Sequence, residues 1–350
     1  MRALGSFWMR WGYYCSSSHP EGIQRFRCRL CRVTFSRTVF LLEYRAMKRF
    51  LNYAIFQKIT TGHSACEIAR QLHCSEHLVR ERLRKLARHA FLRHTELIEG
   101  FQIREDVVFD GLENFAGSQY DPNHIQHAVL RDSLFILNFN FAPLNRKGKM
   151  TEEQKVKNEE IQKTQGKYPK KAIRWASKEL FEWLLERKSP EMENLTLVSD
   201  EHFQYRRAIE WDLSGAPIRH IRISSRKTRN YQNLLFSVNH ADLLTRQQLA
   251  AFQRETISFC KTHQAMIERY MLFMVKKNYM RTQFVKKLKR RPRAHLHTPA
   301  MEAGVSTHRF SFREFFGKTL SDQHVTLSRE WKCFYDGVPT YKREPMKVAA

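Results

Sequence analysis

The sequence predicts a multidomain α+β protein, in which an N-terminal hairpin and a helical unit precede a mixed α/β domain. The chain has 350 residues, a length that suggests two or three domains. Its residues are 42% hydrophobic and 12% aromatic, which is enough to fill a sizeable core. Near residue 105 the pattern changes from helical spacing to strand-like runs. We expect units at 1–40, 41–100 and 101–280, followed by a basic C-terminal tail at 281–350.

The charge of the chain indicates a polyanionic partner. It has 61 Lys and Arg against 35 Asp and Glu, a net charge of +26 at pH 7. Nucleic acid is the usual partner for such an excess. The sequence contains no run of 18 apolar residues that would predict a membrane span, and its first residues show no signal-peptide pattern. Seven cysteines with one CxxC favour a reducing compartment. We therefore expect a cytoplasmic protein that binds DNA and no membrane.

Residues 1–40 are expected to form a zinc-ribbon-like hairpin. Two short strand patterns flank a turn rich in Ser, Pro and Gly, and the second leads into Cys28 and Cys31. The CxxC spacing provides half of a tetrahedral zinc site. Cys15 and His19 are the remaining local ligand candidates for Zn²⁺. The alternative is an incomplete ribbon whose other knuckle is missing.

Residues 41–100 are expected to form a helix-turn-helix DNA-binding domain. Apolar residues recur at helical spacing over 44–60, and Ser64 and Ser75 each begin a further helix. The last helix can run to about Arg93 and would lie in the major groove. Its outward-facing, DNA-binding side chains would be His77, Arg80, Arg82 and Arg84. The alternative is an αα-hairpin with a solvated basic face.

Two aspartates in the third unit follow apolar strand patterns. Asp110 lies within VVFDGLENF, and Asp200 follows LTLVS. Aspartate is depleted in strands, and carboxylates on adjacent strands can hold two Mg²⁺ ions that promote phosphoryl transfer. The predicted order β-β-β-α-β-α-β-α matches a ribonuclease-H-like mixed sheet. The alternative is that each aspartate is a strand-end turn residue.

Taken in order, these motifs and LFSVNHADLLTRQQLAAFQRETISFCK resemble the DDE-type insertion-sequence transposases. The resemblance implies a ribonuclease-H-like catalytic domain with two Mg²⁺ ions. It implies strand cleavage and transfer by a homo-oligomer, which binds the element's terminal inverted repeats and target DNA in the bacterial nucleoid. The alternatives are a catalytically impaired, transposase-derived DNA-binding protein, or an RNA-associated basic protein.

The resemblance also implies a third carboxylate, and here the chain departs from the family pattern. Asn239 occupies the position of the family's Glu, seven residues before Arg246. Asp242 follows one helical turn later. The third catalytic ligand is therefore Asp242, or Asn239 with His240, or it is absent. The register to Arg246 favours Asn239 with His240, and hence weak or absent activity.

Further contacts with the DNA backbone are expected from two basic runs, because Lys and Arg neutralise phosphates. The first run, RKTRNY, contains Arg226 and Lys227. The second lies in the basic tail and contains Lys286, Lys287, Arg290 and Arg291. A solvated tail is an equally good interpretation of the second run.

Overall fold

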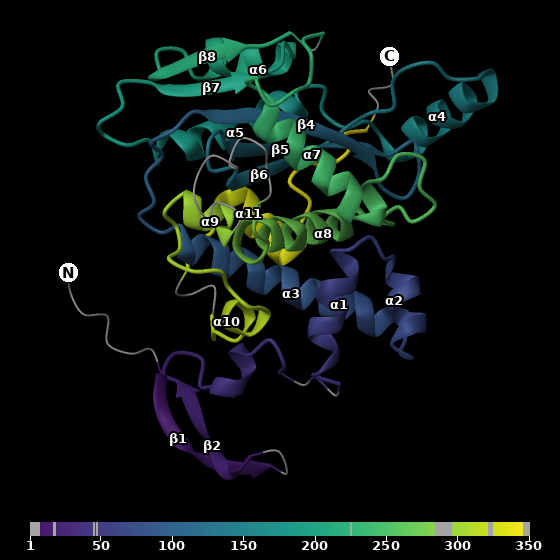
Figure 1. Cartoon of the computed structure of the whole chain (residues 1–350). Helices are drawn as coiled ribbons and strands as arrows, with labels where there is room; N and C mark the ends of the chain where they lie inside the picture. The colour runs from purple at the N-terminus through teal and green to yellow at the C-terminus, as the bar shows by residue number, and fades with distance from the viewer. Residues whose placement is uncertain are drawn as a thin grey trace.

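Two separate β-sheets, one small and one central, organise the α+β fold (Figure 1). The computed structural model describes residues 8–16, 19–44, 46, 48–224, 226–283, 296–320 and 325–345. Within these ranges, no helix combines the length and the hydrophobicity that crossing a membrane requires.

The small sheet contains β1 (Trp8–Ser16), β2 (His19–Cys28) and β3 (Thr34–Ser36), all antiparallel. One face is aromatic: the rings of Trp8 and Phe26 lie 4.7 Å apart, and those of Phe26 and Phe35 lie 5.7 Å apart. A 3₁₀ turn, η1 (Arg37–Phe40), follows. In Figure 1 this sheet projects from the rest of the molecule.

Three helices follow: α1 (Leu51–Ile59), α2 (Ala65–Gln71) and α3 (Glu76–Leu97). The two predicted caps are confirmed, since Ser64 and Ser75 accept backbone N–H groups at 3.2 Å. The first helix is shorter than the predicted 44–60, whereas α3 continues past Arg93. The second half of α3 is buried, and the Nε2 atom of His94 lies 2.9 Å from the Leu137 carbonyl. The helical unit and the central sheet therefore share one hydrophobic core.

The central sheet has the order β6-β5-β4-β7-β8. Its strands are β4 (Val107–Phe115), β5 (Pro122–Leu130), β6 (Ile136–Pro143), β7 (Leu195–Ser199) and β8 (Ile218–Arg222). The first three pair antiparallel, whereas β7 is parallel to β4, and β8 is parallel to β7. This topology makes β4 the middle strand, between β5 and β7.

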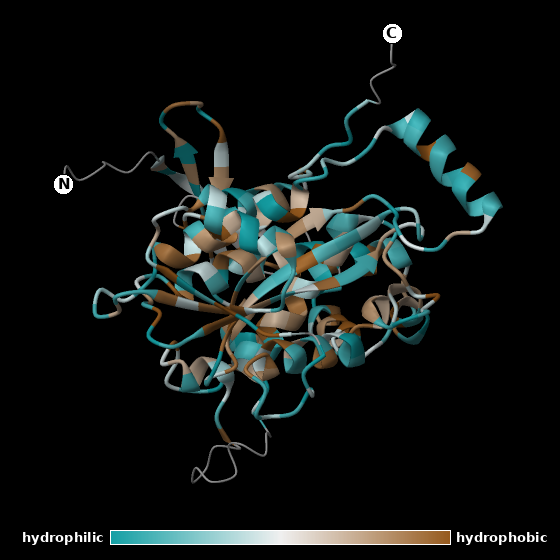
Figure 2. Cartoon of the chain, turned by 90° about the horizontal axis from the view of Figure 1, so that it is seen from above, coloured by the Kyte–Doolittle hydropathy of each residue, from teal (hydrophilic) through white to brown (hydrophobic). Residues whose placement is uncertain are grey.

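Helices cover both faces of the central sheet. Between β6 and β7 come α4 (Glu152–Gln165), which projects from the body and is largely hydrophilic (Figure 2), and α5 (Ala172–Leu185). After β7 comes α6 (Phe203–Arg207), which continues into a π-helical turn, η2 (Ala208–Asp212). Phe109 contacts Phe181 of α5 at 4.8 Å on one face, and Phe139 contacts Tyr270 of α8 at 4.8 Å on the other.

Apolar residues recur at helical spacing over 239–277, a pattern that predicts one helix, but the structure divides this stretch between two helices, α7 (Phe236–Gln248) and α8 (His263–Val275). A 3₁₀ turn, η3 (Ala250–Phe252), and an irregular segment separate them. The second helix has its own N-cap, because the Thr262 hydroxyl accepts the Ala265 N–H at 3.2 Å. A π-helical turn, η4 (Lys276–Met280), ends α8.

The described part of 281–350 is folded onto the body, which corrects the expectation of a basic tail. It contains α9 (Pro299–Glu302), α10 (Phe312–Phe316) and α11 (Arg329–Asp336). Trp331 is only 3% exposed, and its Nε1–H donates to the Phe139 carbonyl at 2.9 Å. Apolar burial of this kind outweighs the basic composition, so the segment belongs to the core.

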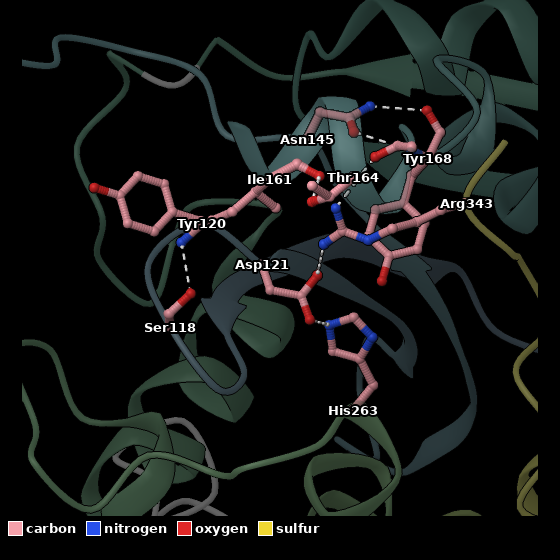
Figure 3. A network of polar contacts seen from close by, with 10 residues as sticks. Ser118, Tyr120, Asp121, Asn145, Ile161, Thr164, Tyr168, His263 and Arg343 are labelled. Carbon is pink, nitrogen blue, oxygen red and sulfur yellow. Dashed lines mark hydrogen bonds and ion pairs between the residues drawn. The ribbon is translucent and has the colours of Figure 1, made fainter. Parts of the chain in front are cut away.

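A polar network fastens the last described residues (Figure 3). The Arg343 guanidinium donates to Asp121 at 2.9 Å and lies 4.4 Å from the centre of the Tyr168 ring. His263, the first residue of α8, approaches the other oxygen of Asp121 at 3.2 Å. Three segments distant in sequence therefore meet at the start of β5.

Candidate active site on the central sheet

Asp110 and Asp200 lie on neighbouring strands, as the sequence predicted. β4 and β7 pair in parallel, with Val107 opposite Leu197 and Val108 opposite Val198. Continuing this register by two residues places Asp200 beside Asp110. Side chains alternate along a strand, so both aspartates lie on the face opposite to Phe109.

The surroundings of Asp110 are strongly acidic. Burial, together with the negative charges of Asp200 and Asp242, raises the pKa of Asp110 to about 8. The Gly111 N–H, which donates to the Asp110 carboxylate at 2.7 Å, and the positive charge of Arg229 act in the opposite direction. Carboxylates from the end of β7 and from α7 are therefore near enough for their charges to act on Asp110 of β4.

Asp242 is held beside β5. Its Oδ1 atom lies 3.1 Å from Nε2 of His127, which is the cross-strand partner of Asp110. The other ring nitrogen of His127 lies 2.5 Å from the Tyr270 hydroxyl. The Oδ1 atom of Asp242 and Nε2 of His127 thus face each other, and this contact holds the Asp242 carboxylate against β5.

Asn239 and His240, which the sequence register favoured, are arranged differently from Asp242. His240 is two residues away, about 200° around the helix, and its ring stacks on Phe236 at 5.6 Å. Burial, together with the charges of Lys277 and Arg281, lowers the pKa of His240 to about 4. Its charged neighbours are therefore cations rather than the acidic residues. Asn239 is half-buried, about 60° from Asp242, and its side chain forms no hydrogen bond within the described ranges.

A second layer of polar side chains lies on the other face of the sheet. The Tyr205 hydroxyl lies 3.1 Å from Nε2 of the buried His124. This His124 ring lies against Gly111, where an added Cβ would be 1.7 Å from it. Gly111 is therefore needed for close packing beside Asp110. The sequence signal for this close packing is an Asp-Gly pair inside a strand pattern.

The three carboxylates are chemically suited to Mg²⁺, which prefers oxygen ligands. Asp110, Asp200 and Asp242 are the residues that would hold it, because the charges of Asp200 and Asp242 both act on Asp110. Across the part of the chain that the structure describes, no three His, Cys, Asp or Glu side chains are already gathered as a metal-binding group. Mutual repulsion of unshielded carboxylates opposes such gathering.

The cysteine knuckle differs from this arrangement. Backbone hydrogen bonds from Cys31 and Leu30 lower the pKa of the Cys28 thiol, as expected for a knuckle. However, Cys28 pairs with Trp8 at one end of the hairpin, whereas His19 pairs with Ser16 at the other. The backbones of Cys15 and His19 are thus roughly 20–30 Å from the knuckle. This corrects the expectation that either completes a zinc site with Cys28 and Cys31.

The expected DNA-contacting residues of α3 divide into two groups. His77, Arg80 and Arg84 are exposed, although Arg80 pairs with Glu76 and Arg84 lies 3.5 Å from Glu81. Arg82, by contrast, is only 6% exposed.

The burial of Arg82 corrects its assignment to the outer face. It lies three residues after the buried Val79, and therefore on the packed side of the helix. Burial lowers the pKa of Arg82, and the charge of Glu43 opposes this shift.

The remaining basic candidates lie in two places. Arg226 and Lys227 are exposed in the loop between β8 and α7, which also carries Arg229, whose charge acts on Asp110. The other four, Lys286, Lys287, Arg290 and Arg291, lie outside the described residues.

The chain matches no protein-family model, and no curated protein matches it.

Proposed function

We propose that the chain is an insertion-sequence DNA transposase, which binds element ends and catalyses magnesium-dependent strand cleavage and transfer. The convergence of Asp110, Asp200 and Asp242 from three separate elements supports this most strongly, together with the raised pKa of Asp110. The strand order β6-β5-β4-β7-β8, with three antiparallel strands and two parallel to β4, favours a ribonuclease-H-like catalytic domain.

The carboxylates would act as oxygen donors on one face of the sheet. Bound Mg²⁺ supplies a Lewis acid that activates water or a 3′-hydroxyl and stabilises charge on the scissile phosphate. Asp110 must lose its proton to take part, and its burial makes this loss costly in the free protein. Asp200 is oriented by the His202 N–H, which donates to its carboxylate at 3.0 Å. Arg229 provides the positive charge nearest to Asp110.

Binding of DNA ends is assigned to the exposed start of α3. His77, Arg80 and Arg84 would contact the major groove and its phosphates. The net charge of +26 favours tight binding that weakens steeply with salt. The homo-oligomeric state remains an implication of the transposase resemblance.

A catalytically impaired DNA-binding protein is the second candidate. It follows from Asn239 at the family's Glu position and from the cysteine knuckle without further ligands. The charge of Asp242, which acts on Asp110, counts against the first of these arguments, because Asp242 is a candidate third carboxylate.

A strand-cleavage and strand-transfer assay on DNA carrying the element's ends, with Mg²⁺ or Mn²⁺, separates the two. We expect Asp110→Asn and Asp200→Asn each to reduce turnover by at least about 100-fold, because loss of a metal ligand should exceed the 10–100-fold cost of changing a residue behind it. DNA affinity should change less than about twofold, because neither residue is assigned to binding.

Asp106→Asn is the matched control. Asp106 precedes β4 and pairs with Arg131 at 2.7 Å, away from the acid site. Its turnover should equal that of the unmodified chain. The transposase proposal would be contradicted if Asp110→Asn cleaved DNA as well as the unmodified chain. It would also be contradicted if the unmodified chain did not cleave DNA that carries the element's own ends.

A further inference from the structure

The helix after Asp200 carries an alternating row of aromatic rings and guanidinium groups. Phe203, Arg207 and Trp211 follow at four-residue spacing and so share one face of α6 and η2. The Arg207 guanidinium lies 5.1 Å from the centre of Phe203 and 4.7 Å from that of Trp211. His202 stacks on Phe203 at 5.3 Å, and Arg174 lies 4.9 Å from Trp211. We call these five residues the aromatic–arginine ladder.

The ladder is ordered but exposed. Phe203 and Trp211 are 49% and 58% exposed, whereas Tyr205 on the same helix is fully buried. Arg174 is fixed by two hydrogen bonds to Asp212, at 2.6 and 2.5 Å. The Nε atom of Arg207 is buried and has no hydrogen-bond partner within the described ranges. A ladder that served only packing would be expected to cover these rings.

A basic groove adjoins the ladder at the end nearest the acid site. His202 is two residues from Asp200, and both His202 and Phe203 line the groove. Arg146, Lys147 and Lys170 also line it, against one acidic lining residue, Glu113. Figure 1 shows α6 beside β7 and β8. The groove and ladder meet at His202 and Phe203, on the face of the sheet opposite to the carboxylates, and they approach the acid site at the sheet edge where Asp200 follows β7.

We propose that this surface binds an unpaired DNA strand next to the acid site. Sites for single-stranded DNA combine cations that follow the phosphates with aromatic and Arg planes on which bases stack. In a duplex the bases stack on one another and their faces are covered, so the exposed rings select unpaired nucleotides. The identity of the strand, as one engaged at the acid site, rests on the proposed function; the binding itself does not.

The test measures binding of the full chain, in EDTA, to a fluorescently labelled 20-nucleotide DNA single strand and to the matching duplex. Phe203→Ala and Trp211→Ala should each raise the Kd for the single strand at least about fivefold, the lower bound for a stacked base. Duplex affinity should change less than about twofold. Trp175→Ala is the matched control, because Trp175 is 39% exposed and lies outside the ladder; both affinities should stay unchanged.

Arg207→Lys keeps the charge but removes the guanidinium plane. It should weaken single-strand binding about as much as the alanine variants, and it decides the matter if Phe203→Ala fails to fold. Phe203→Tyr keeps a stacking ring and should restore normal affinity. Thermal unfolding confirms that each variant is native.

Unchanged single-strand affinity in the ladder variants would overturn the inference, as would an equal loss for the duplex. Tighter binding of the RNA strand of the same sequence would overturn the assignment to DNA. The Asp110→Asn cleavage assay reports separately on the proposed function. If the ladder variants bind the single strand normally while Asp110→Asn abolishes cleavage, only the inference about the ladder is rejected. If the ladder variants lose single-strand binding but the unmodified chain cleaves no DNA, only the transposase proposal is rejected.

Discussion

The acid site and the cysteine knuckle are both candidate metal sites, and they differ in how the fold treats them. Cys28 and Cys31 have the more specific local spacing, yet the hairpin register places Cys15 and His19 at its far end. Asp110, Asp200 and Asp242 are individually unremarkable in sequence, yet three elements bring their charges together. Spacing within one element describes only part of a site, and the fold supplies the rest.

The largest effect is expected from the third carboxylate. Asp242→Asn should reduce metal-dependent cleavage to background, at least about 100-fold, because it removes a carboxylate whose charge acts on Asp110. Asn239→Ala should retain turnover within about threefold, and Asn239→Glu should bring no gain. Turnover in the cleavage assay checks all three. If Asn239→Ala lost turnover and Asp242→Asn retained it, Asn239 would be the third ligand, as the spacing to Arg246 predicts.

The second effect concerns stability against pH in metal-free protein. The folded pKa of Asp110, about 8, exceeds its ordinary value of 3.8, so the folded state holds a proton that the unfolded state has lost. Stability should therefore fall as pH rises from about 4 to 8. Asp110→Asn removes this loss and should stabilise the fold by roughly 3–6 kcal/mol at pH 9, but little at pH 4.

Urea unfolding in EDTA at several pH values measures this difference, with Asp106→Asn as the control. The knuckle offers the contrast, because Cys28→Ser should leave the slope between pH 4 and 8 unchanged. Parallel stability profiles for Asp110→Asn and the unmodified chain would show that the carboxylates are not coupled as described.

Substituting one glycine in each region compares how closely the two backbones are packed. Gly111→Ala should destabilise the chain by at least about 2 kcal/mol, because the added Cβ would lie 1.7 Å from the buried His124 ring. Gly12→Ala in the hairpin should cost only about 1 kcal/mol, since its φ of +77° is unfavourable but no atom lies within 4 Å. Denaturant midpoints of both variants test the ranking, and the opposite order would refute it.

The smallest effect is expected at the knuckle. The double variant Cys28→Ser, Cys31→Ser should change the free energy of unfolding by less than about 0.5 kcal/mol, because two thiols without further ligands hold Zn²⁺ weakly. Titration with Co²⁺ should give no tetrahedral thiolate spectrum at one equivalent per chain. Such a spectrum, lost in the double variant, would mean that ligands come from elsewhere, including a second chain.

Much of the central sheet could be predicted, because its strands are apolar runs with clear ends. The strand Leu195–Ser199 has the predicted bounds, and the neighbours β4 and β7 follow from the element order. Arg82 was assigned outward from its charge, although its three-residue spacing from Val79 already indicated burial. The fold of residues 296–345 depends on contacts such as Trp331 with Phe139, which no local pattern contains.

The aromatic–arginine ladder was detectable in principle, since Phe203, Arg207 and Trp211 have regular spacing. Its significance is not local, however, because it depends on Arg174 from α5 and on the position of Asp200. The choice among Asn239, His240 and Asp242 likewise needed the rotation of α7 relative to β5. Such relations between elements are set by packing and not by periodicity.

The helix α3 has a consequence for where DNA would be cut. Its exposed start carries the proposed recognition residues, and its buried end is bonded to β6 through His94 and Leu137. A continuous helix of 22 residues is about 33 Å long, the length of roughly ten base pairs at ~3.4 Å each. Because one rigid element joins recognition to the sheet, the offset between bound sequence and cleaved phosphate should be a single value, constant across DNA ends.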